Sequence, residues 1–120
     1  MNTKTTKSRQ LEARMLEFAL SVMSLTKKTP RTAENRIIIE QLVRSAASIG
    51  ANYTEANNAI SRQDFRNKIF IAKKEAAETR YWLRLLASAN PYLDTNYLVG
   101  EVTELLLILQ RVVTTLRNGQ

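Results

Sequence analysis

Apolar residues recur at steps of three and four along four stretches of this chain, with polar residues between them. This spacing places the apolar side chains on one face of an α-helix and leaves the other faces to water. The pattern therefore predicts four amphipathic helices, each with one buried stripe. The stripes are Leu11, Met15, Phe18, Val22 and Leu25; Ile38, Leu42, Ala46, Ile49 and Tyr53; Phe65, Ile69, Ala72, Ala76, Thr79, Leu83 and Leu86; and Leu98, Val102, Leu105, Leu109, Val112 and Leu116.

Capping and helix-breaking residues mark the ends of these helices. The first helix is expected from residue 8 to about residue 27, before Pro30, and the second to about residue 56. The third ends at Asn90-Pro91. Short connections make consecutive helices antiparallel neighbours. The predicted fold is all-α, a single-domain up-down-up-down antiparallel four-helix bundle over residues 8–118, with residues 1–7 as a flexible basic tail. The expected N-caps are Thr32, Ser61 and either Asp94 or Thr95.

A polar stripe lies beside the apolar one on helix two. A buried polar group without a hydrogen bond costs about 1–3 kcal/mol, so this stripe predicts an ordered polar network with another helix. Glu75 or Glu78, spaced three residues apart on helix three, is expected to pair with Arg44. The alternative is that the stripe consists of ordinary half-exposed positions. Its residues are Gln41, Arg44, Ser45, Ser48, Asn52 and Glu55.

Helices two and three resemble those of a known bacterial family. The matching residues are Gln41, Leu42, Arg44, Ser45, Ser48, Ile49, Ala51, Asn52 and Glu55, then Ile71-Ala72, Lys74-Glu75-Ala76, Glu78-Thr79 and Tyr81-Trp82-Leu83. Over residues 11–116 the chain is similar to the four-helix-bundle proteins encoded by intervening sequences of bacterial large-subunit rRNA genes. The resemblance implies a ring, most often a pentamer. A protein related in fold, the accessory variability protein of diversity-generating retroelements, is a basic pentamer that works with a reverse transcriptase and RNA. The resemblance therefore makes an RNA-handling role an expectation here.

Helix four carries more apolar residues than one stripe requires. Val99, Leu106 and Val113 lie seven residues apart, and Ile108 also falls outside the main stripe. A helix that is apolar on more than one face needs additional partners. These four residues therefore predict a homo-oligomer interface, unless a wide core uses them inside the protomer.

The composition argues against most enzymatic functions. The chain has no Cys and no His, which removes thiolate nucleophiles, the usual general base and the usual zinc ligand. The alternative is an active site made of three carboxylates, which could perform acid–base chemistry or bind a hard metal. These are Glu55, Glu75 and Glu78, but no Gly-rich phosphate loop accompanies them. The longest apolar run has five residues, so a membrane span and a signal peptide are not expected. We expect a cytoplasmic, non-enzymatic protein without cofactor or metal.

The positive charge is concentrated on two of the four helices. The chain has 18 basic and 11 acidic residues, a net charge of +7, which favours a polyanionic partner. Residues 1–36 contribute +5 and residues 57–90 contribute +4. Five cations of helix three fall within about 40° of one another, along about 30 Å of helix. We call this set the basic rail; it comprises Arg62, Arg66, Lys73, Arg80 and Arg84.

A second cluster, the basic pole, follows from the predicted topology. Helix one ends and helix two begins at the end of the bundle where helix three ends. The cations of that first connection should therefore gather near Arg80 and Arg84. They are Lys27, Lys28, Arg31 and Arg36.

These features lead to two hypotheses about function. In the first, the basic rail and the basic pole bind the backbone of RNA or DNA, and a ring repeats that surface several times. In the alternative, the protein is a protein–protein interaction module without a nucleic-acid role, and the rail cations meet acidic groups of a neighbouring subunit or a protein partner. Trp82, next to the rail in sequence, is expected to pack in the bundle and not to stack on bases.

Overall fold

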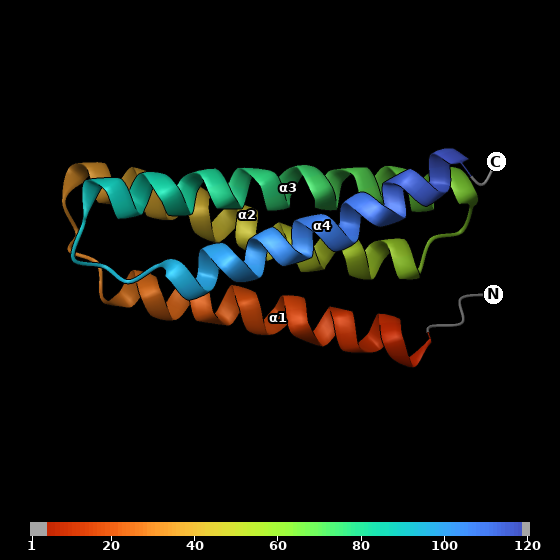
Figure 1. Cartoon of the computed structure of the whole chain (residues 1–120), viewed down its shortest axis with the longest axis horizontal. Helices are drawn as coiled ribbons and strands as arrows, with labels where there is room; N and C mark the ends of the chain where they lie inside the picture. Colours follow the sequence, from red (N-terminus) through yellow and green to blue (C-terminus); the bar gives the residue numbers. More distant parts are fainter. Residues whose placement is uncertain (1–4, 119–120) are drawn as a thin grey trace.

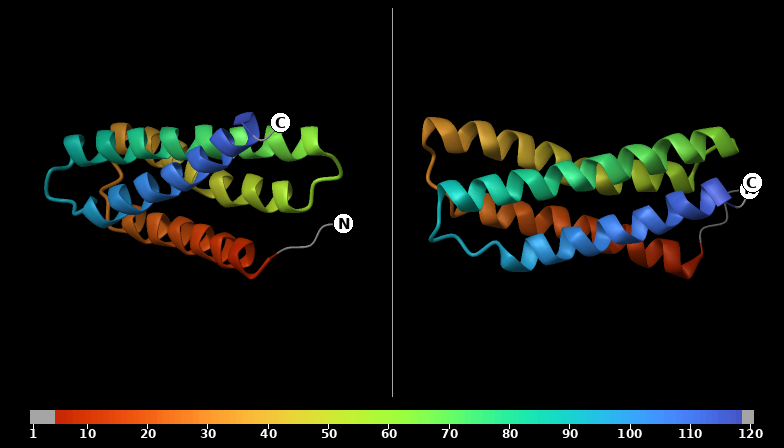
Figure 2. Two further views of the ribbon diagram at one scale, coloured as in Figure 1. Left: turned by 45° about the vertical axis from the view of Figure 1, so that its right-hand side comes forward. Right: turned by 45° about the horizontal axis from the view of Figure 1, so that its top comes forward.

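The structure, a computed structural model, describes residues 5–118 and consists there of four helices. They are α1 (Thr6–Lys27), α2 (Ala33–Asn57), α3 (Arg62–Ala89) and α4 (Asn96–Asn118). All four run roughly along the long axis of a body of 46 × 23 × 21 Å, as Figure 1 shows. Each helix packs against the next in sequence, and α4 closes the bundle against α1. The predicted all-α, up-down-up-down bundle is confirmed; Figure 2 shows it from two further sides.

Side-chain caps begin the helices where the sequence offers a hydroxyl or carboxylate group. The hydroxyls of Thr5, Thr32 and Ser61 each accept a hydrogen bond from the backbone N–H three residues on, at 3.0, 3.1 and 3.0 Å. At α4 the Asp94 carboxylate accepts from the N–H of Asn96 at 3.1 Å. Because Thr5 provides a cap, α1 starts at Thr6, two residues earlier than predicted. The remainder of the predicted tail, residues 1–4, lies outside the described residues.

The core contains nearly all of the predicted apolar stripes. The exceptions are half-buried at its edges: Leu11, Phe65, Val112 and Leu116. The largest side chains without any exposure include Met15, Leu42, Ile49, Ile69 and Leu105, which come from all four helices. The buried faces therefore meet in one continuous core, as four helices of this amphipathic pattern require.

The apolar surplus of α4 lies partly inside the protomer. Val113 is fully buried in the core, so its predicted place in an oligomer interface is wrong. Val99 and Leu106 are half-buried and pack against the core. Ile108 is half-buried in the groove between α1 and α4, beside Leu11 and Tyr53.

An exposed apolar stripe lies on α1 instead. Leu16, Leu20 and Met23 are 62%, 47% and 45% exposed, and their spacing of four and three puts them on one outward face. Since α1 packs against α2 and α4 and not against α3, this face lies on the corner of the bundle diagonal to α3. Among residues 5–118, none of the helices has both the length and the apolar character that crossing a bilayer requires.

Two glycines give opposite expectations for stability. A Cβ added to Gly50 would lie 3.2 Å from Cβ of Met15, because α1 and α2 approach closely there. A Cβ at Gly100 would meet nothing within 4 Å. We expect Gly100→Ala to raise the free energy of unfolding by about 0.5–1 kcal/mol, since alanine favours a helix interior over glycine.

A side chain added at Gly50 should have the opposite effect on the free energy of unfolding. Gly50→Val is expected to lower the free energy of unfolding, because its side chain must displace α1. Urea unfolding followed by circular dichroism measures both variants. A stabilising Gly50→Val would contradict the close approach of the two helices.

Candidate nucleic-acid interface

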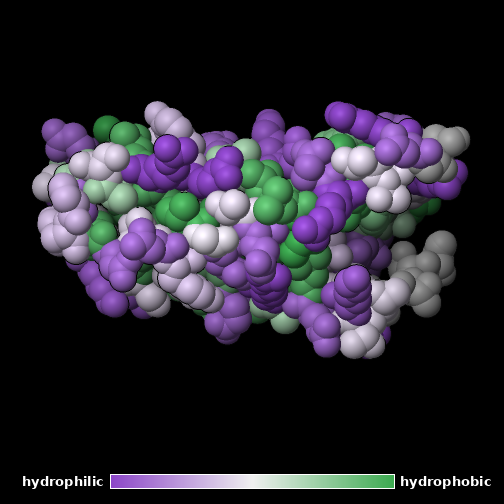
Figure 3. Space-filling view, in the orientation of Figure 1, coloured by the Kyte–Doolittle hydropathy of each residue, from purple (hydrophilic) through white to green (hydrophobic). Residues whose placement is uncertain are grey.

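The basic rail lies on the side of α3 that faces α4. Arg62 and Arg84 are exposed, whereas the other three cations are half-buried. Arg80 lies against α4, where its Nη1 is 3.5 Å from Oγ1 of Thr103. Arg66 lines a hollow together with α4 residues. Arg66 and Arg80 therefore lie along the seam between the two helices, with their stems partly covered and their charged ends near the surface. Figure 3 shows this side of the molecule, where hydrophilic side chains alternate with apolar ones.

No cation of the rail forms an ion pair with any carboxylate in residues 5–118. The ion pairs of this part of the chain use other cations: Arg14 with Glu101 and Glu104, Arg44 with Glu75 and Glu78, and Lys68 with Glu55. Glu75 and Glu78 of α3 are thus directed toward α2, and Glu101 and Glu104 of α4 are directed toward α1, away from the rail. The protomer leaves the charge of the rail available to an external anion.

Two hollows border the rail on its outer side. One, of about 480 Å³, is lined by Ala77, Arg80, Tyr81, Arg84, Leu85 and Ser88. The other, of about 350 Å³, is lined by Gln63, Arg66, Phe70, Leu116 and Arg117. Each combines guanidinium groups with one aromatic ring. Phe70 and Arg117 were not predicted from the sequence, although Phe70 is four residues from Arg66 and so lies next to the rail on a helix.

The predicted pairing of Arg44 across α2 and α3 is confirmed. Arg44 Nη1 donates to Oε1 of Glu75 at 3.2 Å, and its Nη2 contacts the Glu78 carboxylate. Gln41 Oε1 accepts from Arg44 Nε at 3.1 Å. Trp82, half-buried against the core as predicted, donates from Nε1 to Glu78 at 2.9 Å. The guanidinium group of Arg44 thus joins α2 to two carboxylates of α3.

The other residues of the predicted network form separate contacts, some between helices and some within α2. Ser45 joins α2 to α3, since its Oγ lies 2.8 Å from Oγ1 of Thr79. Ser48 Oγ donates to the carbonyl of Arg44, and Asn52 Nδ2 donates to the carbonyl of Ser48, both within α2. Glu55 pairs with Lys68 at 2.8 Å instead of approaching Glu75 or Glu78. Within residues 5–118 the structure brings no three carboxylates together as a metal site.

The stability of the bundle should depend on the ionisation of Glu78. Hydrogen bonding from Trp82, followed by the contact with Arg44, holds the pKa of Glu78 below its ordinary value of 4.5. A carboxyl group with a lower pKa in the folded state stabilises the fold above its unfolded-state pKa and loses this contribution as pH falls through the folded-state pKa. We therefore expect the free energy of unfolding to decrease as the solution is acidified below pH 4.5.

Trp82→Phe tests this assignment because it removes the donor and keeps an aromatic ring. Its pH dependence should be flatter than that of the parent chain, whatever its absolute stability. Tyr97→Phe, at an exposed position, is the control and should leave the dependence unchanged. Denaturant unfolding between pH 3 and pH 7 gives the comparison, and parallel curves for Trp82→Phe and the parent would contradict the role of the indole.

The basic pole is placed at one end of the bundle as predicted. Lys27, Lys28, Arg31 and Arg36 are all exposed there, at the end where α3 also finishes, on the left of Figure 1. Arg80 and Arg84 belong to the last three turns of α3 and therefore share this end. Arg80 lies against α4, whereas Arg36 lies on α2, so the basic residues at this end lie on more than one helix.

A buried amide pair at this pole was not found from the sequence. Asn35 Nδ2 donates to Oδ1 of Asn90 at 3.0 Å, and Asn90 Nδ2 donates to Oδ1 of Asn35 at 2.9 Å. Asn35 also donates to the carbonyl of Pro30 at 2.9 Å, and Asn90 to that of Leu86 at 3.0 Å. The pair joins the first connection to the end of α3 and so fixes the segment that carries the basic pole.

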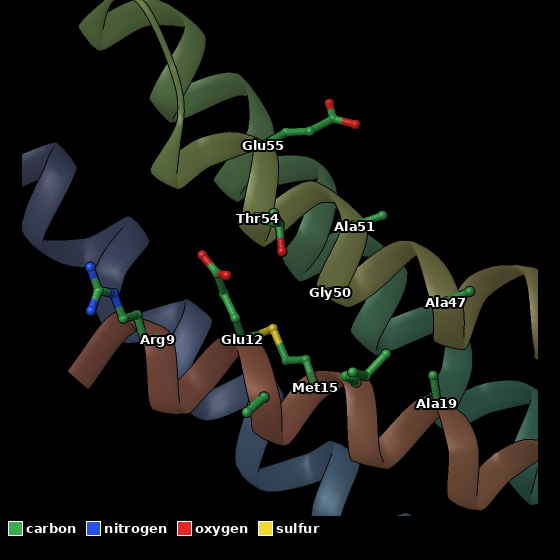
Figure 4. A pocket seen from close by; sticks show the side chains of 11 residues that line it. Arg9, Glu12, Met15, Ala19, Ala47, Gly50, Ala51, Thr54 and Glu55 are labelled. Carbon is green, nitrogen blue, oxygen red and sulfur yellow. The ribbon is translucent and has the colours of Figure 1, made fainter. Parts of the chain in front are cut away.

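A groove of about 720 Å³ lies between α1 and α2. Figure 4 shows Ala19 and Ala47 toward one end and Arg9, Glu12 and Glu55 toward the other, with Gly50 and Ala51 between. Leu16 of the exposed α1 stripe lines the same groove. The small residues of α2 thus leave an apolar surface continuous with that stripe.

Comparison with known proteins identifies the family of this chain and a solved structure with the same fold. The family described as 23S rRNA-intervening sequence protein matches residues 8–113. The chain belongs to this family. A solved structure from Bacteroides thetaiotaomicron VPI-5482, described as a protein with unknown function from the S23 ribosomal protein family, superposes on this 23S rRNA-intervening sequence protein with a TM-score of 0.80. The two share 37% sequence identity over 92% of this chain and 100% of the other. No curated protein matches the chain.

Proposed function

We propose that this member of the 23S rRNA-intervening sequence protein family is a non-enzymatic, homo-oligomeric accessory protein that binds nucleic acid, foremost RNA. The observation that carries the proposal is the basic rail, whose five cations have no carboxylate partner within residues 5–118. A line of unpaired cations along about 30 Å of helix matches a phosphate backbone. Arginine, which provides four of the five, binds phosphate oxygens through two parallel hydrogen bonds.

A ring would multiply this surface. An apolar face is formed by the α1–α2 groove and the adjoining exposed stripe of Leu16, Leu20 and Met23. In a monomer this face would be exposed to water. Because α1 and α3 lie on diagonal corners of the bundle, the α1 side of each subunit contact does not cover the rail. We propose a pentamer, the assembly that the family resemblance implies, with this face in its subunit contacts.

Light scattering tests the function directly. The mass of the assembly is measured alone and with a random-sequence RNA, at low and at physiological salt. The proposal expects an assembly of about five times the 13.7 kDa chain mass that gains RNA at low salt and releases it as salt rises. An assembly that ignores RNA at both salt concentrations would contradict the proposal and favour a protein partner for the rail.

The subunit contact gives a separate prediction. Leu16→Asp with Leu20→Asp is expected to reduce the assembly to monomers, because desolvating two carboxylates at an apolar contact costs more than the contact contributes. Leu107→Asp changes a residue of similar exposure on α4, 51%, and should leave the mass unchanged. Light scattering at matched concentration measures the three chains. A double variant with the parent's mass would contradict the assignment of this face.

A further inference from the structure

Two exposed aromatic rings of α3 lie beside the basic rail. Tyr81 is 58% exposed and Phe70 is 40% exposed. Each ring shares a hollow with guanidinium groups: Tyr81 with Arg80 and Arg84, and Phe70 with Arg66 and Arg117. The bundle core does not account for rings this exposed, since it is complete without them.

We infer that these two hollows are base-stacking subsites, and that the preferred ligand is single-stranded nucleic acid. The inference rests on the proposed function and specifies its ligand class. Single-strand binding combines a cationic track for the backbone with aromatic rings on which bases stack. Both components are present on α3, and the hollow at each ring gives a base access to it.

The spacing of the two rings suits one continuous strand. They are eleven residues apart, which on an α-helix corresponds to about 20° of rotation and about 16 Å along the axis. Both therefore lie on the outer side of the rail, in the same direction from it. A strand whose phosphates follow the rail can turn its bases outward onto both rings.

The Tyr81 ring is held in place by the helix-two and helix-three residues that resemble the family pattern. Its centroid lies 5.1 Å from that of Trp82, in an edge-to-face arrangement with 71° between the planes. Trp82 is fixed by its hydrogen bond to Glu78, and Glu78 by Arg44. A ring oriented before binding loses less conformational freedom when a base stacks on it. Arg44 is thus connected to the Tyr81 subsite through two side chains, those of Glu78 and Trp82.

A duplex cannot use these subsites. Its bases are stacked on one another and paired, so only phosphates and groove edges reach the protein. The apolar side chains of Ala77 and Leu85 in one of the hollows have no counterpart on a phosphate backbone. An unpaired base would cover them.

Fluorescence anisotropy distinguishes the possibilities with a labelled 20-nucleotide single-stranded RNA and the blunt duplex of the same sequence. The proteins are the full chain, Tyr81→Leu, Phe70→Leu, and the control Tyr97→Leu, whose ring is 72% exposed on α4. We expect Tyr81→Leu and Phe70→Leu each to weaken single-strand binding about tenfold with unchanged duplex binding. Tyr81→Phe, which keeps a ring, should restore the single-strand affinity, and Tyr97→Leu should have no effect.

The outcomes separate the inference from the function on which it rests. Single-strand affinity unchanged in Tyr81→Leu and Phe70→Leu, or weakened equally for duplex, overturns the stacking subsites. If the rail variant Arg66→Gln/Lys73→Gln/Arg80→Gln still loses affinity in that case, the proposed function stands. Absence of binding to both RNAs by the full chain overturns both proposals. Circular dichroism of each variant confirms that it is folded.

Discussion

Replacing Arg66, Lys73 and Arg80 together by glutamine is expected to weaken binding of single-stranded RNA about 50-fold at 0.15 M salt. On a single strand, each cation that neutralises a phosphate contributes about 0.7 to the log–log salt dependence of binding. At 0.15 M salt this corresponds to just under about fourfold in affinity for each contact, and three contacts multiply. The three residues have no carboxylate partner among residues 5–118, so their loss leaves no buried acid unpaired and the fold should persist.

The matched control removes the same charge elsewhere. Lys7, Arg9 and Arg111 are exposed and lie on α1 and α4, away from the rail. The variant with glutamine at these three positions has the same net charge as the rail variant. A loss of affinity that follows net charge alone would be equal in the two variants. Equal losses, measured by anisotropy at one salt concentration, would contradict a localised site.

Asn90→Ala is expected to lower the free energy of unfolding by about 2–3 kcal/mol, the largest single-residue effect on stability that we predict. The substitution removes the donor to the side-chain amide oxygen, Oδ1, of Asn35, a residue that is only 3% exposed. It also removes the acceptor of one Asn35 N–H. A buried polar group without a partner bears the full cost of its desolvation. Urea unfolding at neutral pH measures the change.

Two further variants complete that experiment. Asn67→Ala alters an exposed asparagine of α3 whose contact, with Gln63, is also exposed, and should change stability by less than about 0.5 kcal/mol. The double variant Asn35→Ala/Asn90→Ala should lose less than the sum of the two single variants, because the partners are coupled. Additive losses would show that the two amides do not depend on each other.

Helical periodicity was sufficient to predict the fold and most of the core. Its failures have physical causes. A straight α-helix drifts by about 20° for every seven residues, so Val113 lies about 40° nearer to the buried stripe of α4 than Val99 does. The drift turns Val113 into the core and leaves the other two at its edge. On α1, Leu16, Leu20 and Met23 have the same spacing as the core stripe, and periodicity alone does not identify which of two apolar faces remains exposed.

The candidate site was only partly predictable for a related reason. Spacing on one helix places the five rail cations on a line, because they belong to a single element. Whether they are paired depends on the carboxylates that other helices supply. The structure directs Glu101 and Glu104 to Arg14 of α1, contacts that span 87 and 90 residues of sequence.

The missed amide pair shows the same limit. Asn90 stands before a proline at the end of a helix, where an asparagine usually indicates a turn, and Asn35 lies in the first turn of α2. Their contact spans 55 residues and depends on the topology of the bundle. In contrast, the Arg44 pairing with Glu75 was predictable, since helices two and three are consecutive and carry opposite charges on their facing sides.

The salt dependence of RNA affinity tests whether the basic rail binds a nucleic-acid backbone. The logarithm of the association constant is measured against the logarithm of salt concentration for the full chain and for Arg66→Gln/Lys73→Gln/Arg80→Gln. With single-stranded RNA the proposal predicts a steep negative slope for the full chain and one shallower by about 2.1 for the variant, from three lost phosphate contacts. Identical slopes, or no RNA binding by the full chain at low salt, would contradict it.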